Sequence, residues 1–322
     1  MKNIENYGSD YPLRILAAKN KDLRFNSTSG GVVSTLIKVL LDKGYVNSAI
    51  SFEYSDRFFE PRIIYNSNEY VVNGSIYHDI NLPKFINLNI KKIMSPILVT
   101  ALPCQVKPIR KILNKNGIDS IIVSLTCSSQ LSKDATKCFL DMESIACKSI
   151  KSFKYRGSGW PGGINIVYDA GERFISNLNS KWMYIFHSQI FTLEKCYYCN
   201  DTFGKFSDIS VADPWLERYL QSEKLGCTIT MANTKKGNEV LNEMMGSELE
   251  LFEKITMEEL IKSQYWTTEK KYLFRTYPKI TKKLRSFIKS RIYIDYFFKK
   301  FPKLHYLMVM GYLKILKMAT WR

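Results

Sequence analysis

The sequence predicts an α/β protein, α+β overall, with a central mixed, largely parallel sheet, flanking helices, an antiparallel β insertion and a C-terminal helical tail. Residues 97–101 and 121–126 are continuous apolar runs that each precede a helix-like stretch, as buried parallel strands do. Residues 150–177 instead contain two strand-like segments around a turn, which favours antiparallel pairing. With 322 residues, the chain is long enough to bury a large core.

The first third of the chain predicts one helix among strands and loops. Residues 1–26 are polar and indicate irregular structure. Apolar residues recur at helical spacing over 32–41, and Gly44 is a natural helix terminator. We then expect a strand over 46–52, followed by strand and turn segments over 54–94 that end in a basic helix or loop.

The middle of the chain alternates between strands and helices. A helix ending near Gly117 follows the first apolar run, and a helix capped near Ser132 follows the second. Further helices are expected over 180–192 and 234–271, with a strand over 227–232 between them. This alternation is the pattern of a sheet with helices on its faces.

The basic charge is concentrated in the helical tail. The formal net charge is +17, and residues 279–322 carry twelve Lys or Arg against one acid. Apolar residues recur there at helical spacing: Leu304, Leu307, Met308, Tyr312, Ile315, Leu316 and Ala319. One interpretation is an interfacial helix that binds an anionic membrane, and another is a helix that packs on the body with a solvated basic face. Nucleic-acid binding is not expected, because no domain motif accompanies the basic residues.

The compartment is predicted from the N-terminus and the cysteines. No apolar segment of a signal peptide opens the chain, and no apolar run suits a membrane span. We therefore expect a cytoplasmic protein, peripheral to the inner face of the cell membrane if the tail binds lipid. In a reducing compartment, the seven cysteines indicate metal, cluster or redox chemistry more than disulfides.

Four cysteines are candidates for one site. Cys104 and Cys127 each follow a predicted strand, and the carboxyl ends of parallel strands meet at one edge of a sheet. Cys196 and Cys199 form a CxxC pair. Four thiolates suit a 4Fe-4S cluster or a structural zinc ion, whereas each Cys taken alone is as consistent with an inert thiol. The remaining cysteines are interpreted as structural: Cys138, Cys147 and Cys227.

Three further patterns are less specific. The stretch STSGG, residues 27–31, opens a helix, where backbone amides suit a phosphate but an ordinary N-cap is the simpler explanation. In YRGSGWPGG, Arg156 and Trp160 could hold an anionic or aromatic ligand, although a glycine-rich turn is favoured. Asp208 and Asp213 flank a strand, as an acid pair, a ribose-binding carboxylate or turn residues.

Together these motifs resemble the beta subunit of coenzyme F420 hydrogenase and its dehydrogenase relatives. The family's Ser-Ser-Gly-Gly helix start corresponds to STSGGVVSTLIKVLLDKGYV, and its Gly-Ser-Lys-Tyr element to GSIY at 74–77. Its Gly-Thr-Pro-Cys-Gln element corresponds to ALPCQ at 101–105, and its Cys-His-Gly element to CSS at 127–129. Its CxxC, followed by an Asp-Ile and a Gly-Asp-Phe-Trp strand, corresponds to CYYC and SDISVADPW. The resemblance spans roughly residues 24–235.

The resemblance implies an iron-sulfur flavoprotein oxidoreductase. Such a protein passes electrons between FAD and a 4Fe-4S cluster that is served by a ferredoxin-like or other redox partner protein. The implied cluster ligands are Cys104, Cys127, Cys196 and Cys199. The flavin-side residues are expected to be Ser27, Thr28, Ser29, Gly30, Gly31, Gly74, Ser75 and Tyr77, with Arg156 and Trp160 beside them.

The resemblance also implies a domain organisation. An N-terminal flavin-side domain spans 1–95, a C-terminal cluster-binding domain spans 96–278, and the basic amphipathic tail spans 279–322.

The chain departs from the family pattern on the flavin side. Ile76 stands where the family usually has lysine, which leaves the use of coenzyme F420 open. The four thiols of the family pattern remain, whereas the residues around the flavin differ from it. We therefore expect the protein to bind the family's cluster but to use a different electron acceptor. Family members that depart from the pattern in this way resemble proteins that accompany the enzymes of surface polysaccharide biosynthesis. The alternative is a non-redox accessory protein of glycan assembly with a structural metal on the same cysteines.

Overall fold

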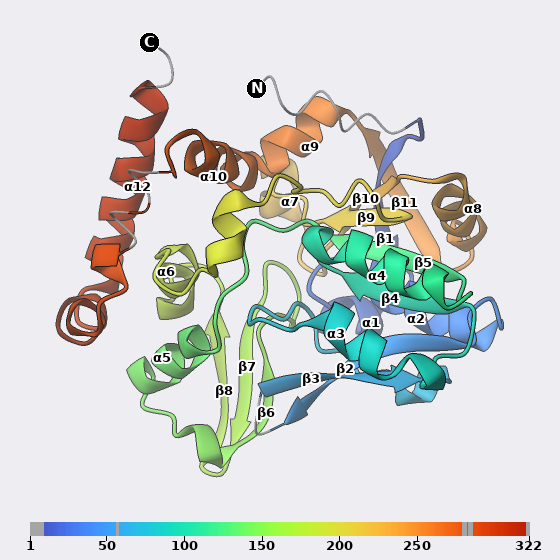
Figure 1. Cartoon of the computed structure of the whole chain (residues 1–322), viewed down its shortest axis with the longest axis horizontal. Helices are drawn as coiled ribbons and strands as arrows, with labels where there is room; N and C mark the ends of the chain where they lie inside the picture. The colour runs from blue at the N-terminus through green and yellow to red at the C-terminus, as the bar shows by residue number, and fades with distance from the viewer. Residues whose placement is uncertain (1–9, 56–57, 279–281, 283–285, 320–322) are drawn as a thin grey trace.

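The computed structural model describes residues 10–55, 58–278, 282 and 286–319 (Figure 1). The strands are β1 Leu13–Ala18, β2 Ser48–Ser55, β3 Phe58–Ile64, β4 Ile97–Ala101, β5 Ser120–Leu125, β6 Ile150–Lys154, β7 Gly163–Tyr168, β8 Gly171–Ser176, β9 Ile209–Ala212, β10 Thr228–Ala232 and β11 Leu249–Ile255. The α-helices are α1 Lys21–Asn26, α2 Val32–Asp42, α3 Leu82–Leu88, α4 Pro103–Lys115, α5 Asp134–Met142, α6 Lys181–His187, α7 Glu217–Ser222, α8 Lys235–Met244, α9 Met257–Ser263, α10 Tyr265–Thr276 and α12 Pro302–Ala319. Short 3-10 turns are η1 Ser67–Glu69, η2 Ile90–Lys92, η3 Cys147–Ser149 and η4 Glu194–Tyr198, and η5 Tyr293–Phe298 is a π-helix.

The main sheet is mixed, with a parallel centre, as the sequence predicts. Its strand order among the described residues is β11-β1-β10-β9-β5-β4-β2-β3. The neighbours β2, β4, β5 and β9 pair in parallel, and the outer pairs are antiparallel. Because β1 and β9 are both antiparallel to β10, β1 runs in the same direction as the parallel centre. Strands from both sides of residue 95 therefore share one sheet, and the carboxyl ends of β1, β2, β4, β5 and β9 share one edge.

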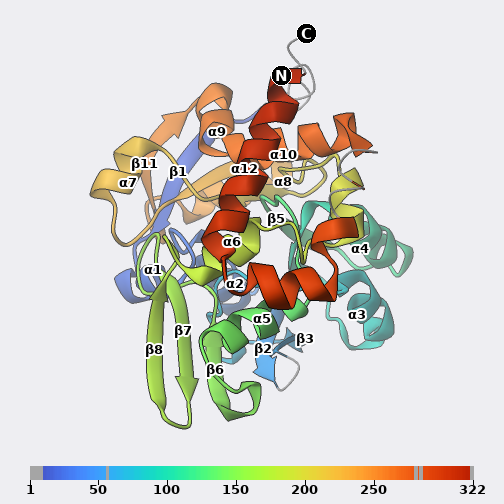
Figure 2. The same ribbon diagram turned by 90° about the vertical axis from the view of Figure 1, so that its left-hand side faces the viewer.

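Helices cover both faces of this sheet, which makes the body an α/β/α sandwich. Alternate residues of β4 point to opposite faces: Leu98 packs with α2 and α8, whereas Ile97 and Val99 pack with α3 and α4. A second sheet, in the order β6-β7-β8, is antiparallel and extends away from the main sheet (Figures 1 and 2). The predicted antiparallel insertion is therefore confirmed.

Two strands lie where the sequence indicated none. The expectation of irregular structure over 1–26 is wrong for β1, which is buried along its whole length. Its charged member, Arg14, donates through Nη2 to the side-chain oxygens of Asn238 and Asn242 at 3.2 and 3.0 Å. The expected helical region 234–271 is wrong for β11, an edge strand that pairs with β1. The middle of β11 is exposed and carries charged residues, as is common at a sheet edge. These charged residues made the segment look like part of a polar helix in the sequence.

The tail packs on the body through α12. Leu313 and Leu316 of α12 are buried against Leu273 and Phe274 of α10, and Figure 2 shows α12 crossing the face of the molecule beside α6 and α10. Within the tail, residues 279–281, 283–285 and 320–322 lie outside the described residues. None of the helices described has the length and apolar character needed to cross a bilayer.

Two helical glycines give a matched test of packing between α8 and the sheet. A Cβ on Gly237 of α8 would lie 2.1 Å from the carbonyl oxygen of Asp208, whereas one on Gly311 of α12 would meet nothing within 4 Å. We expect Gly237→Ala to lower the unfolding free energy by about 1–3 kcal/mol through overpacking. Gly311→Ala should raise it by up to about 1 kcal/mol through helix propensity. Urea unfolding followed by circular dichroism measures both, and equal effects would contradict the packing described.

Candidate functional site

The four thiols singled out in the sequence surround one hollow. Cys104 lies in the first turn of α4, and Cys127 lies just after β5. Cys196 lies in η4, with Cys199 at its end. All four line a hollow of about 510 Å³, far larger than the ~30 Å³ that a single water occupies in the liquid. The strand-end argument thus correctly anticipates that Cys104 and Cys127 meet, and the CxxC segment closes the other side.

The fold holds these cysteines by backbone contacts. The amide of Cys127 donates to the carbonyl of Thr202 at 3.0 Å, which ties the end of β5 to the segment after the CxxC pair. The amide of Gln130 donates to Cys196 Sγ at 3.3 Å. Burial raises the pKa of the Cys127 thiol to about 12, and burial also raises the pKa values of Cys104 and Cys196. A metal centre binding here would therefore have to displace protons from the thiols.

Two buried lysines of α10 lie beside the same hollow: Lys271 lines it, and Lys270 contacts two serines that line it. Lys271 Nζ donates to Cys199 Sγ at 3.4 Å and to the carbonyl oxygen of Asp201 at 2.8 Å. Lys270 Nζ donates to the hydroxyls of Ser128 and Ser129, each at 3.3 Å. Burial lowers the pKa of Lys270 to about 8.

The donor set fits an iron-sulfur cluster. Four thiols, an amide donor to sulfur and nearby cations are the groups that bind and tune such clusters. Among the described residues, no three His, Cys, Asp or Glu side chains are arranged to hold a single metal ion.

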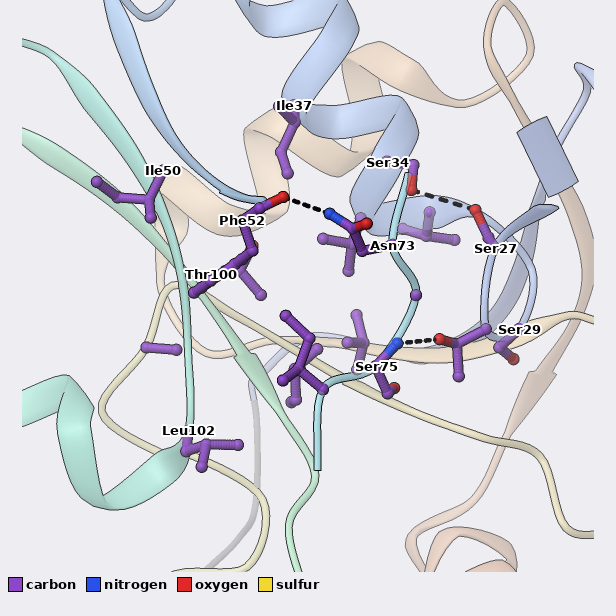
Figure 3. Close-up of a pocket in the computed structure, with 18 of the residues that line it drawn as sticks. Ser27, Ser29, Ser34, Ile37, Ile50, Phe52, Asn73, Ser75, Thr100 and Leu102 are labelled. Carbon is purple, nitrogen blue, oxygen red and sulfur yellow. Dashed lines mark hydrogen bonds between the residues drawn. The ribbon is translucent and has the colours of Figure 1, made fainter. Parts of the chain in front are cut away.

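A second hollow opens at the N-terminus of α2. Figure 3 shows its walls, which include Ser27, Ser29 and Ser34 at the start of the helix and Asn73 and Ser75 from the segment opposite. No side chain caps the N-terminus of α2, so its first amides lack the usual partner at the hollow.

Hydrogen bonds hold the two sides of this second hollow together. Ser27 and Ser34 share a hydroxyl hydrogen bond of 3.1 Å, and the side-chain amide of Asn73 donates to the Phe52 carbonyl (Figure 3). The amide of Ser75 donates to Thr28 Oγ1 at 2.5 Å. The Ser75–Thr28 contact joins the STSGG loop to the 74–77 element.

The two hollows share a wall. Leu102 and Gln130 line both of them. The amide of Gln130 reaches Cys196 Sγ on the thiol side, and its Nε2 donates to the carbonyl oxygen of His78, which lines the other hollow. Groups bound on the two sides would therefore be separated by a single layer of side chains.

Not every predicted flavin-side residue lines the second hollow. Ser27, Thr28, Ser29, Gly31, Gly74 and Ser75 line it. Gly30 is a packing residue, because a Cβ there would lie 2.7 Å from both the Leu16 carbonyl oxygen and the Cys227 Cα. Trp160 is buried in the core against Trp215, with ring centroids 5.1 Å apart.

Arg156 and Tyr77 do not line the α2 hollow, but Arg156 contacts residues that do. The Arg156 guanidinium donates to Asp213 Oδ2 at 3.2 Å, to the Thr28 carbonyl at 3.1 Å and to the Tyr77 hydroxyl at 3.3 Å. Burial alone would lower the pKa of Arg156, but Asp213 and Tyr77 raise it above its ordinary value. Arg156 thus orders the STSGG loop, while Asp213 also lines the hollow.

Asp208 is structural. Its carboxylate accepts from Arg110 at 2.9 Å, from the Ile122 amide at 2.8 Å and from the Thr234 hydroxyl at 3.0 Å.

Three further residues at the site are not indicated by the sequence motifs: Gln130, Lys270 and Lys271. Gln130 follows a named motif and offers a weak signal, but two lysines in a polar helical stretch look like solvated residues.

Two family models match most of the chain. A family model for the N-terminal part of the coenzyme F420 hydrogenase/dehydrogenase beta subunit matches residues 15–87. A second model, for the C terminus of the same beta subunit, matches residues 94–258. No curated protein matches the chain.

Among solved structures, a chain of the F420-reducing NiFe hydrogenase complex from Methanosarcina barkeri has the same fold. It aligns with a TM-score of 0.63 at 16% identity, covering 88% of this chain and 95% of that chain. The family match covers the four thiols and the lining of the α2 hollow, whereas Lys271 of the thiol hollow lies beyond it. The chain belongs to the coenzyme F420 hydrogenase/dehydrogenase beta-subunit family.

Proposed function

We propose that this protein is an iron-sulfur flavoprotein oxidoreductase that holds a 4Fe-4S cluster in the thiol hollow and FAD in the hollow at α2. The observation that carries the proposal is the shared wall of Leu102 and Gln130 between a four-thiol site and an uncapped helix N-terminus. A flavin exchanges electrons in pairs and a cluster exchanges them singly, so neighbouring sites suit a converter between two-electron and one-electron carriers.

The chain's own residues supply the binding groups. Cys104, Cys127, Cys196 and Cys199 would hold the cluster. The first amides of α2 and the hydroxyl-rich STSGG loop suit a flavin phosphate, since helix N-termini favour anions. Gly74 supports the close contact of the loop with the 74–77 element, because a Cβ there would lie 2.8 Å from Thr28 Oγ1 and from the Arg156 carbonyl oxygen.

Finer points of the function stay predictions. The electron donor is predicted to be a ferredoxin-like or other redox partner protein, and the acceptor is predicted to be altered because Ile76 lines the α2 hollow where the family usually has lysine. Two further points are a place in surface polysaccharide biosynthesis and the use of coenzyme F420. Once the cofactors are established, both are tested by measuring electron transfer to candidate acceptors.

We also propose that the outer face of α12 rests on an anionic membrane surface. Leu307, Met308 and Ile315 are each more than half exposed, although the sequence placed them on one apolar face with the buried Leu316. Exposed lysines such as Lys303 and Lys314 lie on the same helix. An apolar exposed face with flanking lysines is the composition of a helix that lies in a lipid interface.

The first prediction concerns the cofactors themselves. Protein purified without oxygen should show both flavin and cluster absorption and contain about four iron atoms per chain. Cys196→Ser should lose most of its iron, because one thiolate ligand is removed. Cys147→Ser is the matched control, since this thiol is exposed and outside the hollow, and should keep its iron.

The alternative function has a distinct outcome in this experiment. A colourless protein with about one tightly bound zinc per chain would contradict the redox proposal and support the non-redox accessory protein of glycan assembly. Iron retained in full by Cys196→Ser would instead refute only the ligand assignment.

A second prediction tests the flavin site. Gly74→Ala should weaken FAD binding at least about tenfold, because the added Cβ pushes Thr28 away from the Ser75 amide. Gly117→Ala has a comparable positive φ, +67° in both residues, but meets nothing within 4 Å and should bind FAD normally. Flavin fluorescence quenching during reconstitution measures both affinities, and equal affinities would move the flavin elsewhere.

A third prediction tests the lipid face by substitution, since truncating the tail would also remove the packing of α12 on α10. Wild type should sediment with anionic vesicles and remain in the supernatant with neutral ones. Leu307→Glu combined with Met308→Glu should abolish the sedimentation. Leu88→Glu, at a 70% exposed site on α3, is the control and should sediment like wild type. Sedimentation unchanged in the double variant would rule out this face.

A further inference from the structure

Two adjacent lysines of α10 are buried beside the thiol hollow. Lys270 and Lys271 are only 6% and 5% exposed. Lys271 Nζ lies 3.4 Å from Cys199 Sγ, and Lys270 Nζ lies 3.3 Å from the hydroxyls of Ser128 and Ser129, the two residues after Cys127. Both ammonium groups therefore face the segments that carry the thiols.

No acid within the described residues compensates these charges. The partners of Lys271 are a sulfur and the Asp201 carbonyl oxygen, and those of Lys270 are hydroxyls. Other lysines of the described residues form ion pairs with carboxylates, but neither Lys270 nor Lys271 does. A buried charge without a counter-ion is costly, so a negative group is expected within reach.

The geometry points to the bound cluster as that negative group. Four thiolates around a 4Fe-4S core carry a net charge of about −2, which two lysines would balance. We propose that Lys270 and Lys271 are fixed counter-charges that raise the reduction potential of the cluster. The inference rests on the cluster of the proposed function and concerns its regulation.

The packing of α10 explains why these cations stay in place. Phe274, one turn after Lys270, packs against Tyr197 with ring centroids 4.9 Å apart. Tyr197 lies inside the CxxC pair, so α10 is attached directly to the cluster segment. Leu313 and Leu316 of α12 cover the same contact from outside.

The test compares reduction potentials of purified holoprotein. Lys271→Met should shift the cluster potential to more negative values, and Lys270→Met should shift it less, because its contacts are to serine hydroxyls and not to sulfur. Lys271→Arg should restore most of the potential by keeping the charge. Arg275→Met removes one charge from the exposed surface of the same helix and should shift it little. Redox titration followed by electron paramagnetic resonance provides the readout.

Each outcome decides between the two proposals. Wild type without a cluster signal would overturn the proposed function and this inference together. A wild-type cluster whose potential is unchanged in both methionine variants would overturn the inference alone. Loss of the cluster from Lys271→Met but not from Lys271→Arg would support the need for positive charge at that position.

Discussion

The common direction of β1, β2, β4, β5 and β9 is the constraint on which the candidate site depends. Because these strands end at one edge of the sheet, the chain leaves them toward the same side. The turn after β4 supplies Leu102 and Cys104, the turn after β5 supplies Cys127 and Gln130, and the segment after β1 leads to the start of α2. The two hollows and the wall between them are therefore built around these strand ends. The 70–82 segment completes the α2 hollow, and the CxxC segment and α10 complete the thiol hollow.

The sequence predicted those parts of the site that depend on local pattern. Cys104 and Cys127 could be placed because apolar runs marked the strands before them. Other parts depend on contacts between distant segments. The charge of Arg14 hid β1, because its partners Asn238 and Asn242 lie more than 200 positions away. Trp160 looked available for a ligand, but the tertiary packing that buries it against Trp215 has no sequence signature.

The composition gives the net charge of the chain but not which charged side chains are buried. The sequence shows a basic chain, yet the lysines nearest the thiols, Lys270 and Lys271, are outside the strongly basic segment and inside the protein. A solvated lysine and a buried one have the same sequence appearance, and only the packing of α10 separates them. Conversely, the sequence left open whether the most basic segment binds a membrane or packs on the body, and Leu313 and Leu316 show that α12 packs on the body.

The packing of α12 over α10 and Tyr197 also makes the CxxC pair sensitive to changes far from it in the sequence. Leu313 and Leu316 of α12 pack with Phe274 of α10, and Phe274 packs on Tyr197, which lies between the two cysteines of the pair. A substitution that displaces α12 would therefore reach the CxxC segment through contacts between side chains, without touching any residue of the hollow itself.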